Sequence, residues 1–243
     1  MDYEGLVYIG ETGRSLRGRI YALRRGIFNG EMPFSDPHTA SPSLWTIVDR
    51  NGPGFEVSGA TPPIVEDKQQ RKAVEDVLIA LHRWETKTNL VGNFGRMPPG
   101  YSKSKTRSTG IRGGRSDDDT LRSFREGVAP LEWENPEEVT DPNWMGLRWS
   151  ARRPLEDALG YVPDGGGVYR IWNSGNCPPL EYIGESVSLK DRLVKHRRNR
   201  DGSLQFSYVP LPDLEEKFQL KQVESELLGA HWLACGEAPV DQY

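Results

Sequence analysis

Apolar and polar positions in the C-terminal half of the chain predict a hairpin followed by a helix. Residues 164–172 (DGGGVYRIW) are a glycine-rich turn leading into an apolar run, and Tyr182-Ile183-Gly184 ends a second run. Two such runs joined by a short loop containing Gly and Pro are typical of a β-hairpin. Leu189 and Leu193 then recur at helical spacing, and Ser186 or Ser188 is a candidate N-cap.

The remainder of this half predicts a third strand and a second helix. LQFSYVPLP (204–212) reads as a strand that ends at prolines. Between Lys217 and Cys235 the apolar residues recur at helical spacing, and the predicted buried stripe is Phe218, Val223, Leu227, Leu228 and Trp232.

The N-terminal half repeats this series. Tyr8-Ile9-Gly10 precedes an arginine-rich helix, GFEVSGATPP (54–63) reads as a strand, and 68–85 reads as a helix. The predicted buried stripe of that helix is Val74, Leu78, Leu81 and Trp84. Both final helices contain Glu-x-x-Leu followed by Ile or Leu, at Glu75 and at Glu224. A repeated order of elements with similar spacing indicates a tandem duplication.

We therefore expect an α+β protein with one unit over 1–100, a connector over 101–154 and a second unit over 155–243. The connector begins with a basic Gly/Ser-rich loop and continues as an acidic segment with Trp133, Trp144 and Trp149. The loop has the composition of a flexible linker or of an arm that orders on phosphates. The tryptophans are interpreted as packing residues, with base stacking as the alternative.

Composition narrows the classes of protein that need to be considered. The chain has 243 residues and a net charge of −4, and no apolar run is long enough to cross a bilayer. We therefore expect no membrane association. Cys177 and Cys235 are the two cysteines, without the spacing of a zinc site, which fits a reducing cytoplasm.

Basic residues gather in three stretches, 12–30, 96–115 and 190–200, although the whole chain is mildly acidic. A single basic stretch is usually a solvated helix face, but three of them favour a polyanionic partner. We expect DNA, double-stranded rather than single-stranded, to contact residues from all three stretches: Arg14, Arg17, Arg24, Arg25, Lys103, Lys105, Arg107, Lys190, Lys195, Arg197 and Arg198.

The second half also contains a set of residues whose side chains could take part in catalysis. Tyr169, Tyr182, Arg192, His196 and Glu224 supply two phenols, a guanidinium, an imidazole and a carboxylate. They form neither a nucleophile–base–acid triad nor a phosphate-binding glycine loop. An Arg can clamp a phosphate, one carboxylate suffices to anchor Mg²⁺ (or Mn²⁺), and a phenol next to a cation can accept a proton from water. The set suits hydrolysis of a phosphodiester.

These residues resemble the GIY-YIG nuclease family. Gly167-Val168-Tyr169, Tyr182-Ile183-Gly184, Arg192, His196 and Glu224 match its motifs in order. The resemblance implies a small three-stranded antiparallel sheet flanked by helices in each unit. It also implies that Tyr182 is the general base supported by Tyr169, that Arg192 and His196 contact phosphate, and that Glu224 is the metal ligand. The family's closing Asn is replaced, and we expect Asp241 in its place.

The first half resembles the family less completely. Tyr8, Arg19, Glu75 and Asn93 match motif positions and form a second candidate site. Only five residues precede Leu6, so the first strand of the hairpin is missing, and Leu23 occupies the His position. We expect a weakened or inactive unit that retains its basic helix; the alternative is two working sites.

The sequence thus predicts a metal-dependent DNA endonuclease of the restriction type, acting as a tandem pair or as a homodimer. One alternative is a non-catalytic nucleic-acid-binding module built from duplicated nuclease units. A third hypothesis is a scaffold protein that does not bind nucleic acid at all.

Overall fold

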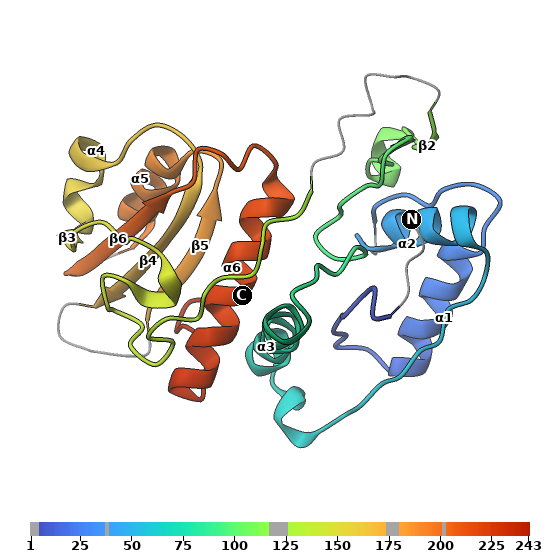
Figure 1. Cartoon of the computed structure of the whole chain (residues 1–243), viewed down its shortest axis with the longest axis horizontal. Coiled ribbons are helices and arrows are strands. Elements are labelled where there is room, and N and C mark those ends of the chain that lie inside the picture. The colour runs from blue at the N-terminus through green and yellow to red at the C-terminus, as the bar shows by residue number, and fades with distance from the viewer. Residues whose placement is uncertain (1–4, 37–38, 117–125, 174–179, 201–202) are drawn as a thin grey trace. The chain divides into compact units, whose positions relative to one another are not determined.

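The computed structural model describes residues 5–36, 39–116, 126–173, 180–200 and 203–243. His38, for which the sequence suggests no function, and Cys177 lie outside the described residues. The protein is α+β (Figure 1), as the sequence predicts.

The chain forms two compact units. Unit 1 consists of Met1–Glu66 and Leu90–Glu126, and unit 2 consists of Asp67–Asn89 and Gly127–Tyr243. This division differs from the ranges 1–100, 101–154 and 155–243, because the helix over 68–86 and much of the connector pack within unit 2.

Unit 2 is built around a four-stranded antiparallel sheet with the order β3-β6-β4-β5. The three longer strands are those the sequence predicts, and the two-residue edge strand β3 was not expected. The elements are α3 (Lys68–Thr86), η4 (Trp144–Gly146), β3 (Arg153–Pro154), η5 (Leu155–Asp157), α4 (Ala158–Tyr161), β4 (Gly167–Asn173), β5 (Tyr182–Ser186), α5 (Leu189–Asn199), β6 (Leu204–Pro210) and α6 (Lys217–Cys235).

Both faces of this sheet are buried, and each has its own core. Along β4, Val168 and Trp172 pack into a cluster that includes Leu227 of α6. The intervening Tyr169 and Ile171 pack into a second cluster with Leu193 of α5. Successive side chains of a strand point to opposite faces, so α6 and α5 cover opposite faces of the sheet.

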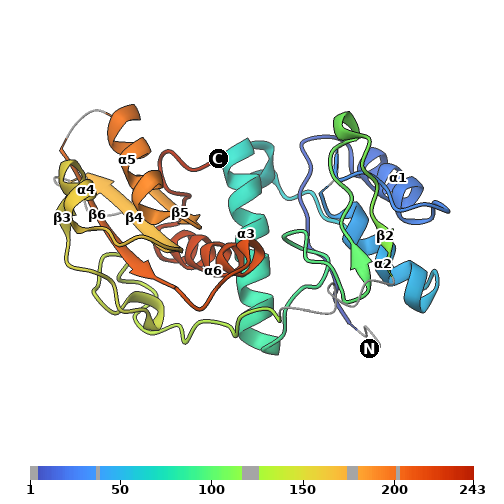
Figure 2. The ribbon, with the colours of Figure 1, turned by 90° about the horizontal axis from the view of Figure 1, so that it is seen from above.

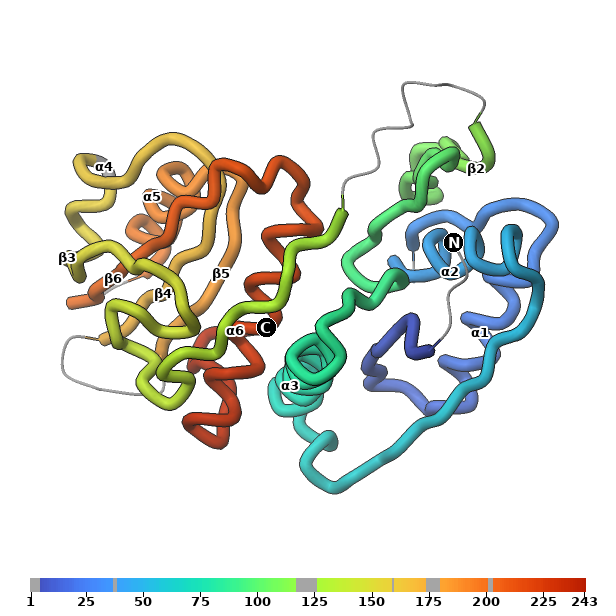
Figure 3. The backbone as a smooth tube through the Cα atoms, in the orientation of Figure 1, coloured from blue at the N-terminus to red at the C-terminus, as the bar shows by residue number. Residues whose placement is uncertain are grey.

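Arg170 fixes part of the connector onto the first of these faces. Its guanidinium donates hydrogen bonds to the carbonyl oxygens of Val139 and Asp141 and to the hydroxyl of Ser207, and lies 4.1 Å from the ring centroid of Trp149. Figure 3 shows the connector passing from α6 to the strands of the four-stranded sheet. Burial lowers the pKa of Arg170 to about 9, so the carbonyls and the indole replace water around its charge.

The connector tryptophans are core residues, as interpreted from the sequence. Trp144 and Trp149 are buried and stack on each other with centroids 5.8 Å apart, and Trp133 packs against the same cluster. Because Trp144 and Trp149 are buried, neither presents an indole face on which a nucleic-acid base could stack.

Helices α3 and α6 cross in contact with each other (Figures 1 and 2). Arg83 of α3 and Glu226 of α6 form a salt bridge with side chains only 1% and 0% exposed. Glu226 also accepts a hydrogen bond from the backbone N–H of Leu131, at 2.7 Å. The buried pair therefore joins both helices and the connector.

The buried face of α3 differs from the predicted stripe. Leu78 and Trp84 are 49% and 44% exposed, whereas Ala73, Val77, Ile79, Ala80 and Arg83 are buried. The small side chains Ala73 and Ala80 allow close helix packing, and Arg83 is buried because Glu226 neutralises it. The predicted stripe of α6 holds better, since Val223, Leu227 and Leu228 are buried.

The described residues of unit 1 do not form the sheet expected for a second copy of the fold. Its elements are α1 (Leu16–Ile27), α2 (Ser41–Asn51), η1 (Pro63–Glu66), β1 (Tyr101–Ser102), η2 (Arg107–Thr109) and β2 (Gly114–Arg115). Among the residues described in this unit, the strands are the two-residue pair β1 and β2 alone. Residues 54–63, predicted as a strand, form none.

The reason lies in the partner of the Tyr8-Ile9-Gly10 segment. The N–H of Gly92 donates to the carbonyl of Val7, and the Asn93 amide binds both the N–H and the carbonyl of Ile9, at 3.1 and 2.8 Å. An extended loop and one side chain thus satisfy the backbone where a hairpin strand would pair. The tandem duplication stays a prediction.

Candidate active site

The hairpin of β4 and β5 brings together the two tyrosines that the sequence selects. Tyr169 lies opposite Gly184, and Tyr182 lies opposite Ile171. The two phenol rings stack with centroids 5.9 Å apart and planes 18° from parallel. A Cβ at Gly184 would collide with the Tyr169 hydroxyl, so glycine at this position allows the phenol to lie against the strand.

Arg192 of α5 links the two hydroxyl groups. Its Nε donates to Tyr169 Oη at 3.1 Å, and its Nη2 donates to Tyr182 Oη at 3.3 Å. These contacts raise the pKa of the Arg192 guanidinium, so the group is a permanent cation. Helix α5 begins after Ser188, one of the two predicted caps, and its buried Leu189 and Leu193 turn Arg192 toward the hairpin.

His196 lies one turn further along α5 and completes the cluster. Its Nε2 is 2.8 Å from Tyr169 Oη, and Arg200 donates from Nε to its Nδ1 at 3.1 Å. Burial, with Arg200 and Arg192 nearby, lowers the pKa of His196 to about 4, so the ring is neutral at pH 7. Because Arg can only donate, Nδ1 is the acceptor and the ring proton lies on Nε2, directed at Tyr169.

The two tyrosines differ in environment. Tyr169 is fully buried, and this burial raises its pKa, so it keeps its proton at neutral pH. Tyr182 is only partly buried, packs its ring 4.8 Å from that of His196, and lies under the Arg200 guanidinium. The more accessible phenol is therefore the better placed of the two to meet a substrate.

Glu224 lies on α6, beside the end of the hairpin. Its Oε1 accepts a hydrogen bond from the backbone N–H of Glu185 at 3.2 Å. Burial, followed by the charges of Glu185 and Asp76, raises the pKa of Glu224 to about 8. A buried carboxyl in this environment needs either a proton or a cation.

The site has features that fit a hard divalent cation at Glu224. Mg²⁺ is commonly held by one or two carboxylates together with water and substrate oxygens. Glu185, which follows the hairpin glycine, has a second carboxylate oxygen, Oε2, that is buried and accepts no hydrogen bond from the described residues. Within the described ranges, no group of three or more His, Cys, Asp or Glu side chains is arranged around one metal position.

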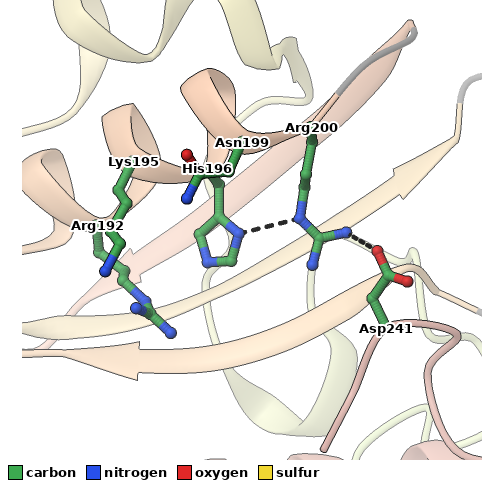
Figure 4. Close-up of a pocket in the computed structure, with 6 residues that line it drawn as sticks. All are labelled: Arg192, Lys195, His196, Asn199, Arg200 and Asp241. Atoms are coloured by element: carbon green, nitrogen blue, oxygen red, sulfur yellow. Dashed lines mark hydrogen bonds and ion pairs between the residues drawn. The ribbon is translucent and has the colours of Figure 1, made fainter.

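A pocket of about 400 Å³ opens beside this cluster (Figure 4). It is lined by Arg192, Lys195, His196, Asn199, Arg200 and Asp241. In the close-up, the guanidinium of Arg200 lies between the His196 ring and the Asp241 carboxylate. Three basic side chains against one carboxylate make this lining suitable for an anion such as phosphate.

Asp241 does not take the role expected of the closing residue. Its carboxylate forms an ion pair with Arg200. Instead, the side-chain oxygen of the next residue, Gln242, accepts the N–H of Ile183 at 3.1 Å. Asn93 makes the same contact with Ile9 in unit 1, so Gln242 is the structural counterpart of Asn93.

The second candidate site is only partly assembled. In unit 1, Arg19 Nη2 donates to Tyr8 Oη at 3.1 Å, and Asn93 holds the adjacent Ile9. Glu75 lies on α3 and so belongs to unit 2. Unit 1 thus repeats the tyrosine–arginine contact of unit 2.

Most of the predicted DNA-contacting residues are accessible. Lys190 is partly buried, and the others are exposed: Arg14, Arg17, Arg24, Arg25, Lys103, Lys105, Arg107, Lys195, Arg197 and Arg198. Exposure allows contact with phosphates but is equally typical of solvated basic side chains.

Three residues of the site were not selected from the sequence. Arg200 belongs to a basic stretch and could have been chosen by its spacing from His196, four residues earlier. Gln242 could have been found only through its equivalence to Asn93. Glu185 directly follows Tyr182-Ile183-Gly184, and Glu11 follows Tyr8-Ile9-Gly10, which was a usable signal.

Comparisons of the chain with protein-family models, curated proteins and solved structures find no match. No helix in the described ranges combines the length and apolar character required to cross a membrane.

Proposed function

We propose that unit 2 is a divalent-metal-dependent nuclease that hydrolyses phosphodiester bonds in double-stranded DNA. The observation that carries the proposal is the Arg192 guanidinium bonded to the hydroxyls of Tyr169 and Tyr182, at the edge of a basic pocket. A guanidinium in this position can bind a phosphate and remain close to the phenol that acts on water.

The proposed reaction assigns a separate task to each side chain. With Tyr182 in its phenolate form, a water oxygen forms a bond to phosphorus, the water proton passes to the Tyr182 oxygen, and the opposite P–O bond breaks. The leaving oxygen then takes a proton from solvent, and Tyr182 returns its proton to solvent after the reaction. Arg192 balances the charge that develops on the phosphoryl oxygens. Glu224 would hold the metal ion, which supplies charge stabilisation for the leaving oxygen.

Tyr169 and His196 act as positioning residues in this scheme. The buried Tyr169 hydroxyl receives donors from both Arg192 and His196, which fixes the guanidinium against the hairpin. Arg200 fixes His196 in turn, and Asp241 holds Arg200. The network keeps His196 neutral and its proton directed inward.

A restriction or defence role in the cytoplasm is part of this proposal, with the two units or two copies of the chain providing sites for two strands. The exposed arginines of α1 favour one alternative, a non-catalytic nucleic-acid-binding protein. Binding of that kind would fall steeply with salt and need no metal.

Cleavage of supercoiled plasmid with Mg²⁺ or Mn²⁺ tests the proposal. The wild type should nick or linearise the plasmid, Glu224→Ala should not, and Glu75→Ala shows whether α3 contributes. If several plasmids, including modified DNA, remain intact with wild-type protein while salt-sensitive binding is measured, the binding protein replaces the nuclease.

A further inference from the structure

Glu185 occupies an unusual position for an acidic residue. It lies on β5 directly after Gly184, and its side chain is only 8% exposed. Its backbone N–H donates to Oε1 of Glu224, so the two residues adjoin at the end of the hairpin. One carboxylate oxygen, Oε1, lies 3.5 Å from Nζ of Lys217, while Oε2 is buried and accepts no hydrogen bond within the described part of the chain.

A buried acceptor without a partner is costly, because the oxygen loses its water and gains nothing in exchange. The cost is greater here, since Glu224 is a second carboxyl in the same place. The arrangement concentrates negative charge in a region with little access to water.

Lys217 does not account for this arrangement. Its side chain is 66% exposed, and its Nζ lies at the long distance of 3.5 Å from Oε1. An ion pair with one solvated partner contributes little to stability. It also leaves Oε2 unsatisfied, so the inner side of the Glu185 carboxylate still lacks a positive charge.

We propose that Glu185 is a second protein ligand of the divalent-cation site, and that Glu185 Oε2 and the Glu224 carboxylate bind one Mg²⁺ or Mn²⁺ between them. This inference rests on the proposed function, in which Glu224 holds the metal. Two carboxylates with remaining positions for water and phosphate oxygens are a common arrangement for these ions.

Direct measurement of Mn²⁺ binding to the full chain, by electron paramagnetic resonance of free Mn²⁺, tests the inference without relying on activity. Glu185→Gln keeps the size of the side chain and removes its charge. It should weaken Mn²⁺ binding at least about tenfold, as Glu224→Gln should, because affinity for these ions depends on the number of charged ligands. Glu156→Gln, which removes an exposed carboxylate from η5, is the matched control and should leave the affinity unchanged.

Two further variants separate ligation from a structural role. Lys217→Gln removes the competing ammonium and should raise Mn²⁺ affinity, whereas a role of Glu185 in the ion pair alone predicts no gain. Glu185→Asp should recover part of the lost affinity if the carboxylate binds metal. Circular dichroism shows whether each variant is folded. If Glu185→Gln does not fold, the Mn²⁺ affinity of the folded Glu185→Asp protein decides whether the Glu185 carboxylate binds the metal.

The outcomes for the two proposals are distinguishable. If Glu185→Gln binds Mn²⁺ as tightly as wild type while Glu224→Gln does not, the inference is overturned and the nuclease proposal is unaffected. If the wild type binds Mn²⁺ through both carboxylates but cuts no DNA, the second-ligand inference holds and the proposed nuclease function fails. If no variant differs because the wild type binds no Mn²⁺, the inference is overturned.

Discussion

The hydroxyl of Ser225 on α6 donates a hydrogen bond to the carboxylate of Asp76 on α3, and each residue is the ninth of its 19-residue helix. The same equivalence holds one turn later, where Ala80 and Gly229 are in contact. Helices that meet at equivalent positions are typical of a two-fold interface. The two similar helices therefore pack on each other as identical subunits would.

Substitution of Gly229 by Ala should destabilise unit 2. A Cβ at this position would lie 2.5 Å from the Ala80 Cβ, with Asp76 and Val77 backbone atoms at 3.0 and 3.2 Å. The expected loss is about 1–3 kcal/mol, whereas Gly→Ala in an exposed helix would gain about 1 kcal/mol. Urea unfolding measures the sign. The double variant Ala80→Gly/Gly229→Ala should recover part of the loss, and a stabilised single variant would contradict the contact.

Loss of Arg83 should be among the most damaging single changes in α3. Arg83→Met leaves the Glu226 carboxylate buried and unpaired, and breaking such a pair costs about 3–5 kcal/mol. Adding Glu226→Leu removes that charge, so the double variant should be more stable than Arg83→Met alone. Guanidinium unfolding of the four proteins gives the coupling between the two residues. Additive effects would show that the pair is not coupled.

Acid should destabilise the protein through two buried histidines. Burial lowers the pKa of both His196 and His231 to about 4, below the usual 6.5. The unfolded chain therefore binds more protons than the folded one between these values. Stability should be complete above pH 6.5 and fall as the pH decreases toward 4. Imidazole titration by NMR checks this directly, and a pKa near 6.5 for His196 would mean that burial does not hold this ring in its neutral form and would contradict the prediction.

If the nuclease proposal holds, Arg192→Lys should reduce cleavage by about 100-fold or more. A Lys ammonium lacks the planar fork of the guanidinium, which bonds both phenols and can clamp a phosphate through two parallel hydrogen bonds. Tyr182→Phe should abolish the base and lose at least as much activity. Tyr169→Phe should be milder, since that hydroxyl only positions Arg192. Single-turnover plasmid cleavage provides the rates, with DNA binding as the control. A greater loss from Tyr169→Phe would reverse the roles of the two tyrosines.

Gln242→Ala should cost about 1–3 kcal/mol by leaving the buried N–H of Ile183 without an acceptor. Asp241→Ala, one residue earlier, breaks a partly exposed ion pair and should cost less than about 1 kcal/mol. Thermal unfolding of the two variants compares them under the same conditions. Equal effects would mean that Gln242 is not the closing residue.

The core of the candidate site could be predicted from the sequence because local pattern determines it. A hairpin register places Tyr169 and Tyr182 on neighbouring strands, and helical spacing places Arg192 and His196 on one face. Residues whose roles depend on distant partners were harder to find. Gln242 belongs to the site because its side-chain oxygen accepts the N–H of Ile183, and Glu185 belongs to it because it lies next to Glu224 of α6.

The same reason explains the errors in the N-terminal half. Hydrophobicity alone favours Leu78 and Trp84 as buried residues of α3, but the surface of α6 selects Val77 and Ala80 instead. The strand expected over 54–63 needs a hairpin beside it to pair with, and Asn93 and Gly92 occupy the backbone of the segment that would begin one.

The assignment of α3 to unit 2 also affects how the protein is made. A ribosome completes α3 and then synthesises residues 87–216 before α6 appears. During that interval the face of α3 that holds Val77 and Ala80 has no helix to cover it, and such apolar surface favours aggregation in nascent chains. The helix pair of unit 2 can therefore form only after α6 has been synthesised, and a fragment that begins at residue 127 would lack half of this pair.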